Sequence, residues 1–540
     1  MHIVVDRRPD GVALIDDDGS ETLVPETRLP AAVAEREVEH PRWVWTSTVQ
    51  WYPPLLEAGV RVDRCYDLKL VDAILAGIAG RAPRRDWGSA PATSRGDTLF
   101  DLDGATDAAH AISALAAWES QQAAIAAHGE PTKLTLLVAA ESAGALAAVE
   151  MRHAGLPWDA AAHDTLLTEA LGPRPPPGQR PAQLEALAHD VEQLLGVGPV
   201  SIDSPPALVS ALRRAGLEVA TTRSGELKRI DHPAMAPLLQ YKTLSRLHTA
   251  NGWNWLDEWV REGRFRPTFV PGGVVTGRWA SDGGGALQLP KQVRPAVHAD
   301  DGWALVVADA AQLEPRILAA LSGDAAMATA GAGGDLYAGI VASGAVVTRE
   351  HAKVGMLGAM YGGTTGISAQ VLPRLARSFP RAIGYVEAAA RAGERGERVS
   401  TRLGRTSPAP PTSWREQQSA AVAEGAAESV VRSARSAARS WGRFTRNFVV
   451  QGTAAEWALA WMAGVRRRLW TPDAGPIESQ PHLVFFVHDE LIVHSPVDRV
   501  AEVEHALHEA AIDAGRIVFG VTPVTFPVTV AAVQRYSEAK

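Results

Sequence analysis

The chain has 540 residues, of which 46% are hydrophobic and 21% charged, and its formal net charge at pH 7 is −8. This length exceeds one hydrophobic core and predicts about three or four globular domains, and the first 20 residues lack the apolar stretch of a secretory signal. No run of 18 uninterrupted apolar residues is present, so no membrane span is expected, and the single cysteine, Cys65, excludes an internal disulfide and favours a reducing cytoplasm.

The predicted secondary structure of the first half of the chain changes near residue 130. Residues 1 to about 130 predict short strands and helices with a loop over 82–100. Long helical patterns follow from about 132, interrupted by a Pro/Gly-rich loop at 172–181. The stretch "SIDSPPALVSALRRAGL" begins with a Ser/Asp cap and prolines in the first turn, which predicts a helix start, and a helix pair is expected before residue 260.

Strands return from residue 265 with "RFRPTFV", "GGVVTGRWA" and "ALVVADA". Helices are predicted from 315 to about 395, and 407–418 is predicted to be a loop or insertion. Two β-rich runs at 483–496, a helix at 498–515 and a last strand close the chain. Strands, a helical insertion and strands again predict a sheet domain that is discontinuous in sequence.

Acidic residues occur where two of these predicted strands end. Asp309 ends an apolar strand, and His488-Asp489-Glu490 falls at the tight turn of a hairpin. If the strands are neighbours in one sheet, the carboxylates lie close together and repel each other unless a cation binds between them. Oxygen ligands favour Mg²⁺ as this cation, and Mn²⁺ is the alternative. Two such ions about 4 Å apart would serve phosphoryl transfer. The alternative is an aspartate that caps a helix and an unrelated surface turn.

Two helical stretches carry cations on one face. In "TREHAKVGMLGAMYGG", Arg349, Lys353 and Tyr361 share a face that suits a triphosphate and a stacked base, although a solvated basic helix ending at Gly362 has the same pattern. In "VRSARSAARSWGRFTR", arginines recur every three or four residues, which suits phosphate neutralisation or, again, a solvated face. These arginines are Arg432, Arg435, Arg439, Arg443 and Arg446.

Taken together, these stretches resemble the family A DNA polymerases of the bacterial DNA polymerase I type. Asp309-Ala310-Ala311-Gln312-Leu313-Glu314 resembles the family's D-Y-S-Q-I-E, and Arg349, Lys353, Tyr361 and Gly362 fit its R-x3-K-x7-Y-G. His488-Asp489-Glu490 is its H-D-E. Two further segments match, the T-G-R…L-Q segment through Thr276, Gly277, Arg278 and Gln288, and N-x3-Q-G-T-A-A through Asn447, Gln451 and Gly452.

The resemblance implies roles for these residues. Asp309 and Asp489 would hold two Mg²⁺ ions with Glu490 in support, and Glu314 would exclude the ribose 2′-OH. Nucleotide contacts would come from Gln312, Arg349, Lys353, Leu357 and Tyr361. Contacts with primer–template DNA would come from Thr276, Arg278, Gln288, Arg443, Asn447, Gln451 and His488.

The sequence departs from the family pattern in three places near the nucleotide. Ala310 and Ala311 replace the Tyr and Ser of the first motif, Leu357 stands where an aromatic ring is usual, and "LQLP" lacks the Asn of L-Q-N-I-P. None of these changes touches the metal carboxylates. We therefore expect catalysis to persist with altered efficiency or fidelity.

The N-terminal region is expected to be a degenerate 3′–5′ exonuclease-like domain. The first strand, "IVVDRRPD", lacks Glu two residues past Asp6, "WYP" fills the region of the central Asp, and no Tyr is followed by Asp four residues on. Asp67 remains, but one acid does not build a two-metal site. The 5′-nuclease domain of full-length relatives is expected to be absent.

The predicted fold is a multidomain α/β and α+β right-hand polymerase (palm, fingers and thumb) preceded by a ribonuclease H-like domain. We expect the exonuclease-like domain at 1–130, a helical linker and thumb at 131–260, palm at 261–321 and 443–540, and fingers at 322–442. The predicted function is template-directed DNA synthesis from deoxynucleoside triphosphates, in repair or gap filling, in the nucleoid-associated cytoplasm without a membrane. The alternatives are a primer–template binding factor that has lost turnover and a polymerase with residual 3′–5′ exonuclease activity.

Overall fold

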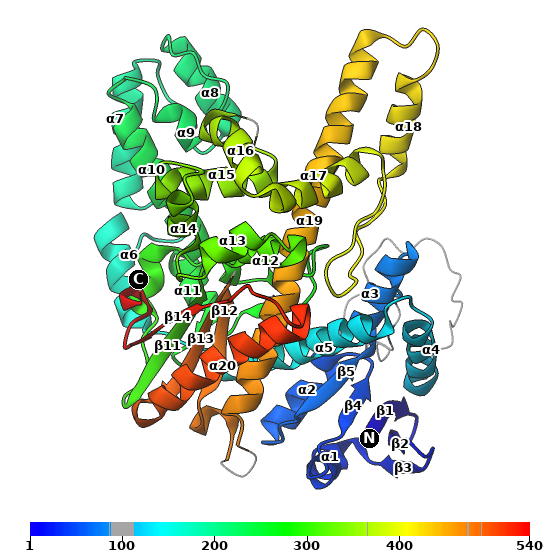
Figure 1. Ribbon diagram of the computed structural model, residues 1–540. Coiled ribbons are helices and arrows are strands. Elements are labelled where there is room, and N and C mark those ends of the chain that lie inside the picture. Colours follow the sequence, from blue (N-terminus) through cyan, green and yellow to red (C-terminus); the bar gives the residue numbers. More distant parts are fainter. Residues whose placement is uncertain (86, 88–112, 364, 472–474, 488, 540) are drawn as a thin grey trace, which may run out of the picture. The chain divides into compact units, whose positions relative to one another are not determined.

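The computed structural model describes residues 1–540 except 86, 88–112, 364, 472–474, 488 and 540 (Figure 1). The chain forms two compact units. The first unit comprises Met1–Ala154, Thr268–Asp282 and Val306–Ala532. The second comprises Gly155–Pro267, Gly283–Leu305 and Val533–Lys540.

The first unit begins with a five-stranded sheet in the order β3-β2-β1-β4-β5. β1 pairs antiparallel with β2 and parallel with β4, and β4 pairs parallel with β5. The strands are β1 His2–Arg8, β2 Gly11–Asp16, β3 Glu21–Val24, β4 Arg42–Trp45 and β5 Arg64–Asp67. The accompanying helices are α1 Leu29–Glu37, α2 Thr48–Glu57, α3 Leu68–Ala79 and α4 Ala114–Ala126. Fully buried Trp43, Trp45 and Tyr52 fill the core, which confirms the predicted α/β fold.

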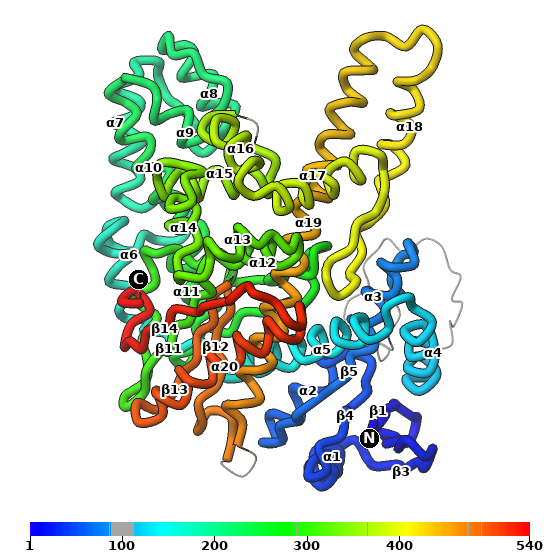
Figure 2. The backbone as a smooth tube through the Cα atoms, in the orientation of Figure 1, coloured from blue at the N-terminus to red at the C-terminus, as the bar shows by residue number. Residues whose placement is uncertain are grey.

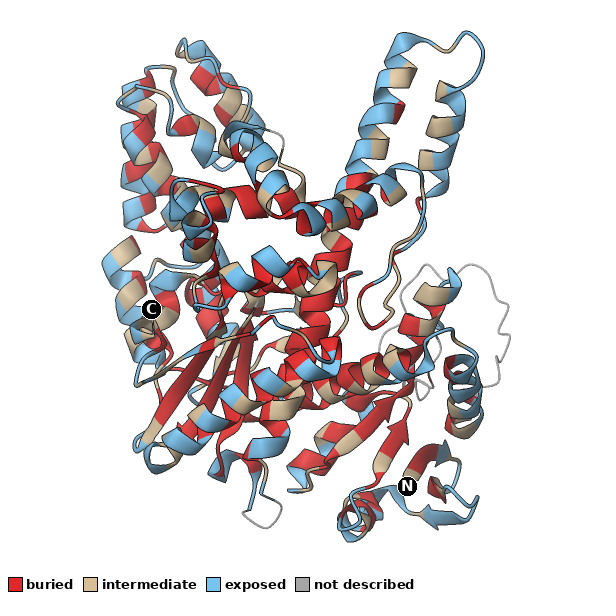
Figure 3. Cartoon of the chain, in the orientation of Figure 1, coloured by how far each residue is buried: buried red, intermediate tan, exposed pale blue. Residues whose placement is uncertain are grey.

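Helix α5, Pro131–Ala154, joins this sheet to the rest of the first unit. It packs against α2 and β5 of the first sheet, and also against helix α19, Glu428–Leu469, and strand β12, His482–Val487. By length and composition it could cross a membrane, but 78% of its most apolar window is buried inside the protein (Figure 3). Burial of this kind is that of a core helix in a globular protein.

The second sheet of this unit has the order β12-β13-β11-β14. Its strands are β11 Trp303–Ala310, β12 His482–Val487, β13 Glu490–Pro496 and β14 Val528–Val533. β12 and β13 form the predicted antiparallel hairpin, in which Val487 pairs with Glu490. Helices α19, Glu428–Leu469, and α20, Val500–Phe519, pack against each other and contact this hairpin. The discontinuous sheet domain predicted from the sequence is therefore present.

The predicted helical insertion lies between β11 and α19. It contains α12 Leu313–Ser322, α13 Ala325–Gly331, α14 Leu336–Ala342, α15 Arg349–Tyr361, α16 Gly366–Ser378, α17 Pro380–Glu394 and α18 Thr412–Ala421. The prediction of a loop over 407–418 was wrong in part, because α18 begins directly after Pro411. Its residues are good helix formers, and it runs beside the first half of α19 (Figure 2).

The strand predicted over "GGVVTGRWA" was also wrong in part. Residues 271–278 form turns, and only β10, Ala280–Asp282, is extended, paired with β9, Thr268–Val270. Gly272 and Gly277 have φ angles of 61° and 87°, in the left-handed region that favours glycine. Turn formation at these glycines therefore outweighs the strand preference of the β-branched residues between them.

The second unit is mainly helical, as predicted. Its helices are α6 Ala160–Leu171, α7 Ala182–Leu195, α8 Pro205–Arg214, α9 Ser224–Leu227, α10 Met235–Asn251 and α11 Trp253–Trp259. A small sheet of β6 Leu156–Pro157, β8 Arg264–Phe265 and β7 Val260–Arg261 accompanies them. Trp158, Trp255, Phe265 and His163 pack ring against ring with centroids 4.9–5.7 Å apart. These tryptophans belong to the core.

Candidate active site

Asp309 and Asp489 come together at adjoining ends of the two central strands of the second sheet. β13 and β11 are neighbours in that sheet, and the N–H of Ala310 donates to the carbonyl of Asp489 at 3.0 Å. Asp489 lies in the β12–β13 turn, both aspartates are half-buried, and Glu490 is buried. The N-cap of α12 is Gln312, so Asp309 is not the capping residue of that helix.

The donor chemistry of these strand ends fits Mg²⁺ or Mn²⁺. Among the residues that the structure describes, no group of three or more His, Cys, Asp or Glu side chains is arranged to hold a metal. Mg²⁺ bound with substrate phosphates needs only one or two protein carboxylates, because phosphate oxygens and water complete its shell. A pair of adjacent, half-buried aspartates at the ends of two central strands therefore suits an ion that binds together with a phosphorylated substrate.

Helix α15 presents the predicted cations to solvent. Thr348 caps its first turn and Gly362, with a φ of 72°, ends it in the left-handed region. Arg349 and Lys353 are exposed, and Leu357 and Tyr361 are half-buried. A side chain at position 362 would also meet Arg443, since a Cβ there would lie 2.8 Å from its Cγ. The glycine after Tyr361 is thus explained by the helix end and by this close approach.

Arg349 is held by two residues that sequence reasoning did not identify. Its Nε donates to Asp335 at 2.7 Å, and its guanidinium lies 5.5 Å from the ring centroid of Tyr337. Asp335 is also the N-cap of α14. Burial opposes ionisation of Asp335, but the bonds from Arg349 and from backbone N–H groups lower its pKa below the ordinary value. The sequence signal was the Gly-Gly-Asp that precedes α14.

Glu314 is the centre of a hydrogen-bonded group beneath this helix. Tyr361 Oη donates to it at 2.5 Å, and Arg278 forms an ion pair with it. Burial, together with the adjacent Glu314, raises the pKa of Tyr361 to about 12. Gln451 also interacts with Tyr361. Glu314, Arg278, Tyr361 and Gln451, which the sequence places in four separate motifs, are therefore gathered at one point.

The turn that carries Arg278 rests on α19. The Thr276 side chain is buried, and its carbonyl would lie 3.0 Å from a Cβ at position 452. Gly452 therefore allows the turn to approach the helix. The Thr276 hydroxyl and the Asn447 side-chain oxygen are buried polar atoms with no hydrogen-bond partner among the described residues. Both atoms belong to the predicted DNA-contacting set.

The arginines of α19 divide into two groups. Arg432, Arg435, Arg439 and Arg443 are exposed along one face. Arg446 lies on the same helical face, but the expectation that it is available for phosphate was wrong, because it is buried, pairs with Glu387 and donates to the carbonyl of Ala359 at 2.9 Å. Helical spacing alone could not distinguish it, since α15 and α17 cover that part of α19.

Gln312 and Arg316 secure the segment after Asp309. Gln312 has a φ of 50°, and its side-chain oxygen accepts the Leu336 N–H at 3.2 Å. Arg316 is fully buried and donates to the carbonyls of Ala311, Gly331 and Thr525 at 3.0 Å. Its role was not predicted, and the only signal was an arginine within an apolar helix. Predicted residues His488 and the Gln288 side chain lie outside the described structure.

Comparison with known proteins places these features in a family. The model of DNA polymerase family A matches residues 179–534, well over half of the chain. DNA polymerase I of Thermus filiformis is 29% identical over 327 residues, which cover 54% of this chain and 36% of the relative. DNA polymerase I of Chloroflexus aurantiacus is 27% identical over 340 residues, covering 58% and 33%. The chain thus matches about a third of the length of these relatives.

The fold is similar to that of a solved structure. The POL domain of Pol1 from M. smegmatis, in complex with DNA primer-template and dNTP, superposes with a TM-score of 0.71 at 21% identity. The match covers 99% of this chain and 95% of that one. The superposition supports the polymerase fold, and the matched family model identifies the lineage. The chain belongs to DNA polymerase family A.

Proposed function

We propose that the protein is a DNA-directed DNA polymerase that extends a primer 3′-OH with deoxynucleoside triphosphates. The observation that carries this proposal is that Asp309 and Asp489 lie at adjoining ends of the neighbouring strands β11 and β13. Next to a polyanion, paired carboxylates are unfavourable unless they bind cations. A DNA-binding factor without turnover does not need paired carboxylates, whereas nucleotidyl transfer needs them to hold metal ions.

The chain's own side chains would position both substrates. Exposed Arg349 and Lys353 would bind the triphosphate, and Tyr361 would lie beside the templating base. Glu314, fixed by Tyr361 and Arg278, would block a ribose 2′-OH. Asp309 and Asp489, with buried Glu490 in support, would hold Mg²⁺, which when bound would neutralise charge on the attacking and leaving oxygens.

We propose further that the N-terminal domain does not proofread. The Asp67 carboxylate accepts the N–H groups of Thr48 and Leu70 at 2.7 and 3.0 Å, so it caps α3. Asp6 accepts the Ala114 N–H at 3.3 Å and pairs with Arg8. Both acids thus have structural partners, and these contacts support a domain that is retained for packing.

Primer extension with Mg²⁺ and all four dNTPs tests the polymerase proposal. Extension should be lost in Asp309→Asn and in Asp489→Asn and preserved in Asp498→Asn, which changes an exposed acid near the same hairpin. If wild type binds primer–template tightly without extending it, the protein is a binding factor instead. A mismatched primer incubated without dNTPs should keep its length, and shortening that persists in Asp489→Asn would revive the exonuclease.

A further inference from the structure

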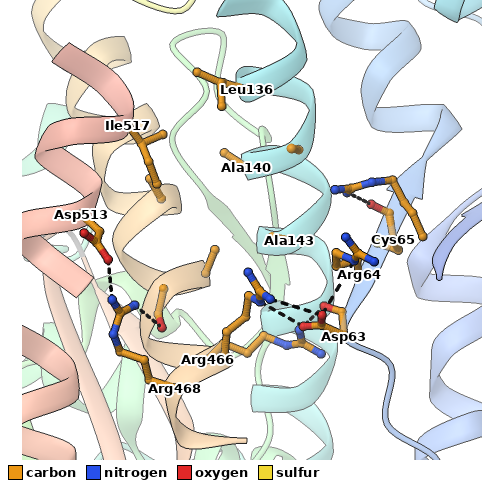
Figure 4. Close-up of a pocket in the computed structure, with 16 residues that line it drawn as sticks. Asp63, Arg64, Cys65, Leu136, Ala140, Ala143, Arg466, Arg468, Asp513 and Ile517 are labelled. Carbon is orange, nitrogen blue, oxygen red and sulfur yellow. Dashed lines mark hydrogen bonds and ion pairs between the residues drawn. The ribbon is translucent and has the colours of Figure 1, made fainter. Parts of the chain in front are cut away.

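An arginine-rich pocket lies between the five-stranded sheet and helices α5, α19 and α20. Its volume is about 300 Å³, and none of its lining residues belongs to the site around Asp309 and Glu314. Figure 4 shows Leu136, Ala140 and Ile517 toward one end and Arg466, Arg468 and Asp63 toward the other. The pocket is therefore apolar at one end and charged at the other.

The apolar part is a slot between two helices. Ala139, Ala140 and Ala143 of α5 line one side, and Ala460, Ala463 and Gly464 of α19 line the other. On each helix these residues are three or four positions apart or adjacent, so they share a face. Small side chains therefore line both of these sides of the pocket.

The charged part has an excess of cations. Five arginines and two aspartates line the pocket, and Glu150 outside the lining pairs with Arg466. These acids are shared, because Asp63 pairs with both Arg64 and Arg467, and Glu150 pairs with both Arg61 and Arg466. The formal charge around the pocket therefore stays positive, and Arg42 has no ion-pair partner among the described residues. Burial is the main cause that lowers the pKa of Arg42. Cys65 and Asp63 act to raise this pKa, whereas the neighbouring Arg64 and Arg467 lower it further. An anion in this position would relieve that repulsion.

The remaining arginines still have donors to offer. Arg42 donates to the Cys65 carbonyl at 3.0 Å, and Arg468 donates to the Gly464 carbonyl at 3.2 Å and pairs with Asp513. A guanidinium has five N–H donors, so these contacts leave others unused. Arg467 and Arg64 have side chains 62% and 39% exposed, so the charged end is open to solvent.

We propose that this pocket binds a nucleoside 5′-monophosphate, with its phosphate at the arginine end and its base in the alanine slot. A phosphomonoester carries about −1.5 to −2 charge at pH 7, which is opposite in sign to the charge of the arginine end. About 300 Å³ is at the lower end of ligand pockets, so the pocket has room for one nucleotide. The same chemistry could come from a free nucleotide or from the 5′-phosphorylated end of a DNA strand.

Calorimetric titration of the full-length protein with dAMP, in EDTA and without DNA, tests this site. One dAMP should bind, and deoxyadenosine should bind far more weakly. Arg64→Gln/Arg467→Gln should weaken dAMP binding by about ten- to a hundredfold, and Ala463→Leu should also weaken it by filling the slot. The matched control, Arg214→Gln/Arg223→Gln, changes two exposed arginines that do not line the pocket and should leave binding unchanged.

A variant of the proposed triphosphate-binding residues distinguishes dAMP binding in this pocket from dAMP binding in the polymerase site. Arg349→Ala/Lys353→Ala should keep dAMP binding, and thermal unfolding of each variant without ligand shows whether it is folded. Absence of dAMP binding, equal affinity in Arg64→Gln/Arg467→Gln, or loss only in Arg349→Ala/Lys353→Ala overturns the proposal. Competition by a 5′-phosphorylated oligonucleotide but not by its 5′-hydroxyl form identifies a strand end as the ligand, and no competition by either identifies the free nucleotide.

Discussion

Replacing Arg466 with methionine should destabilise the protein by about 3–5 kcal/mol, because it removes one member of a buried ionic group. Arg466 Nε and Nη2 donate to the Glu150 carboxylate at 2.9 and 2.7 Å, and Nη1 donates to the Asp63 carbonyl at 2.7 Å. Tyr52 and Arg61 also donate to Glu150, at 2.6 and 3.0 Å. This group links α2 and the segment 61–63 to α5 and α19, so its loss should weaken the packing between them.

The adjacent residue provides a matched control. Arg467 has a side chain 62% exposed and pairs with Asp63 at 3.1 Å. An exposed pair contributes little, so Arg467→Met should cost less than about 1 kcal/mol. Urea unfolding followed by tryptophan fluorescence measures both variants, and the first transition is the one to compare because a chain with several domains need not unfold in one step. Equal shifts in the two variants would refute the reasoning.

The pH dependence of the same group gives an independent check. Burial by itself would raise the pKa of Glu150, but the charges of Arg466 and Arg61 outweigh it and lower the pKa to about 2. A lowered folded-state pKa means that the contribution is present above the ordinary value of 4.5 and is lost as the pH falls toward 2. The difference in stability between wild type and Glu150→Gln should therefore shrink over that range. A difference that stays constant would contradict the assigned charge state.

Three further predictions concern DNA binding, sugar selection and a second buried acid. Arg435 and Arg439 have no ion-pair partner among the described residues. Arg435→Ala/Arg439→Ala should therefore reduce the slope of log K against log salt for primer–template binding by about 1.8. Arg415→Ala on α18 is the control, and an unchanged slope in the double variant would assign that face to solvent. Glu314→Ala should raise the ratio of ribonucleotide to deoxynucleotide incorporation by roughly ten- to two-hundredfold in single-turnover assays. An unchanged ratio would show that Glu314 does not select the sugar. Burial raises the pKa of Glu456 to about 7, so wild type should lose up to about 3 kcal/mol as the pH rises from 4.5 through 7 because only the unfolded state ionises there. Glu456→Gln should lack this loss, and the same pH profile in both proteins would disprove the raised pKa.

The sequence was sufficient for features set by neighbours along the chain. The alternation and turn around Asp489 predicted the β12–β13 hairpin, and the helical spacing from Arg349 to Tyr361, closed by Gly362, predicted α15. Such patterns depend on interactions within a few residues. For the same reason local reading misjudged 272–280, where left-handed glycines produce turns, and 407–418, where α18 is supported by packing on α19.

Only the tertiary structure decided which distant residues meet. Sequence periodicity placed Arg446 among the exposed arginines of α19, but α15 and α17 cover it. The sequence does not show that β11 and β13 are neighbours. Their pairing in the folded sheet brings Asp309 to Asp489. Likewise, Asp335 and Tyr337 around Arg349, and Glu150 between Arg61 and Arg466, depend on contacts between separate segments. Periodicity along one segment carries no information about which other segment packs against it, and that packing determines the burial, partners and pKa of each side chain.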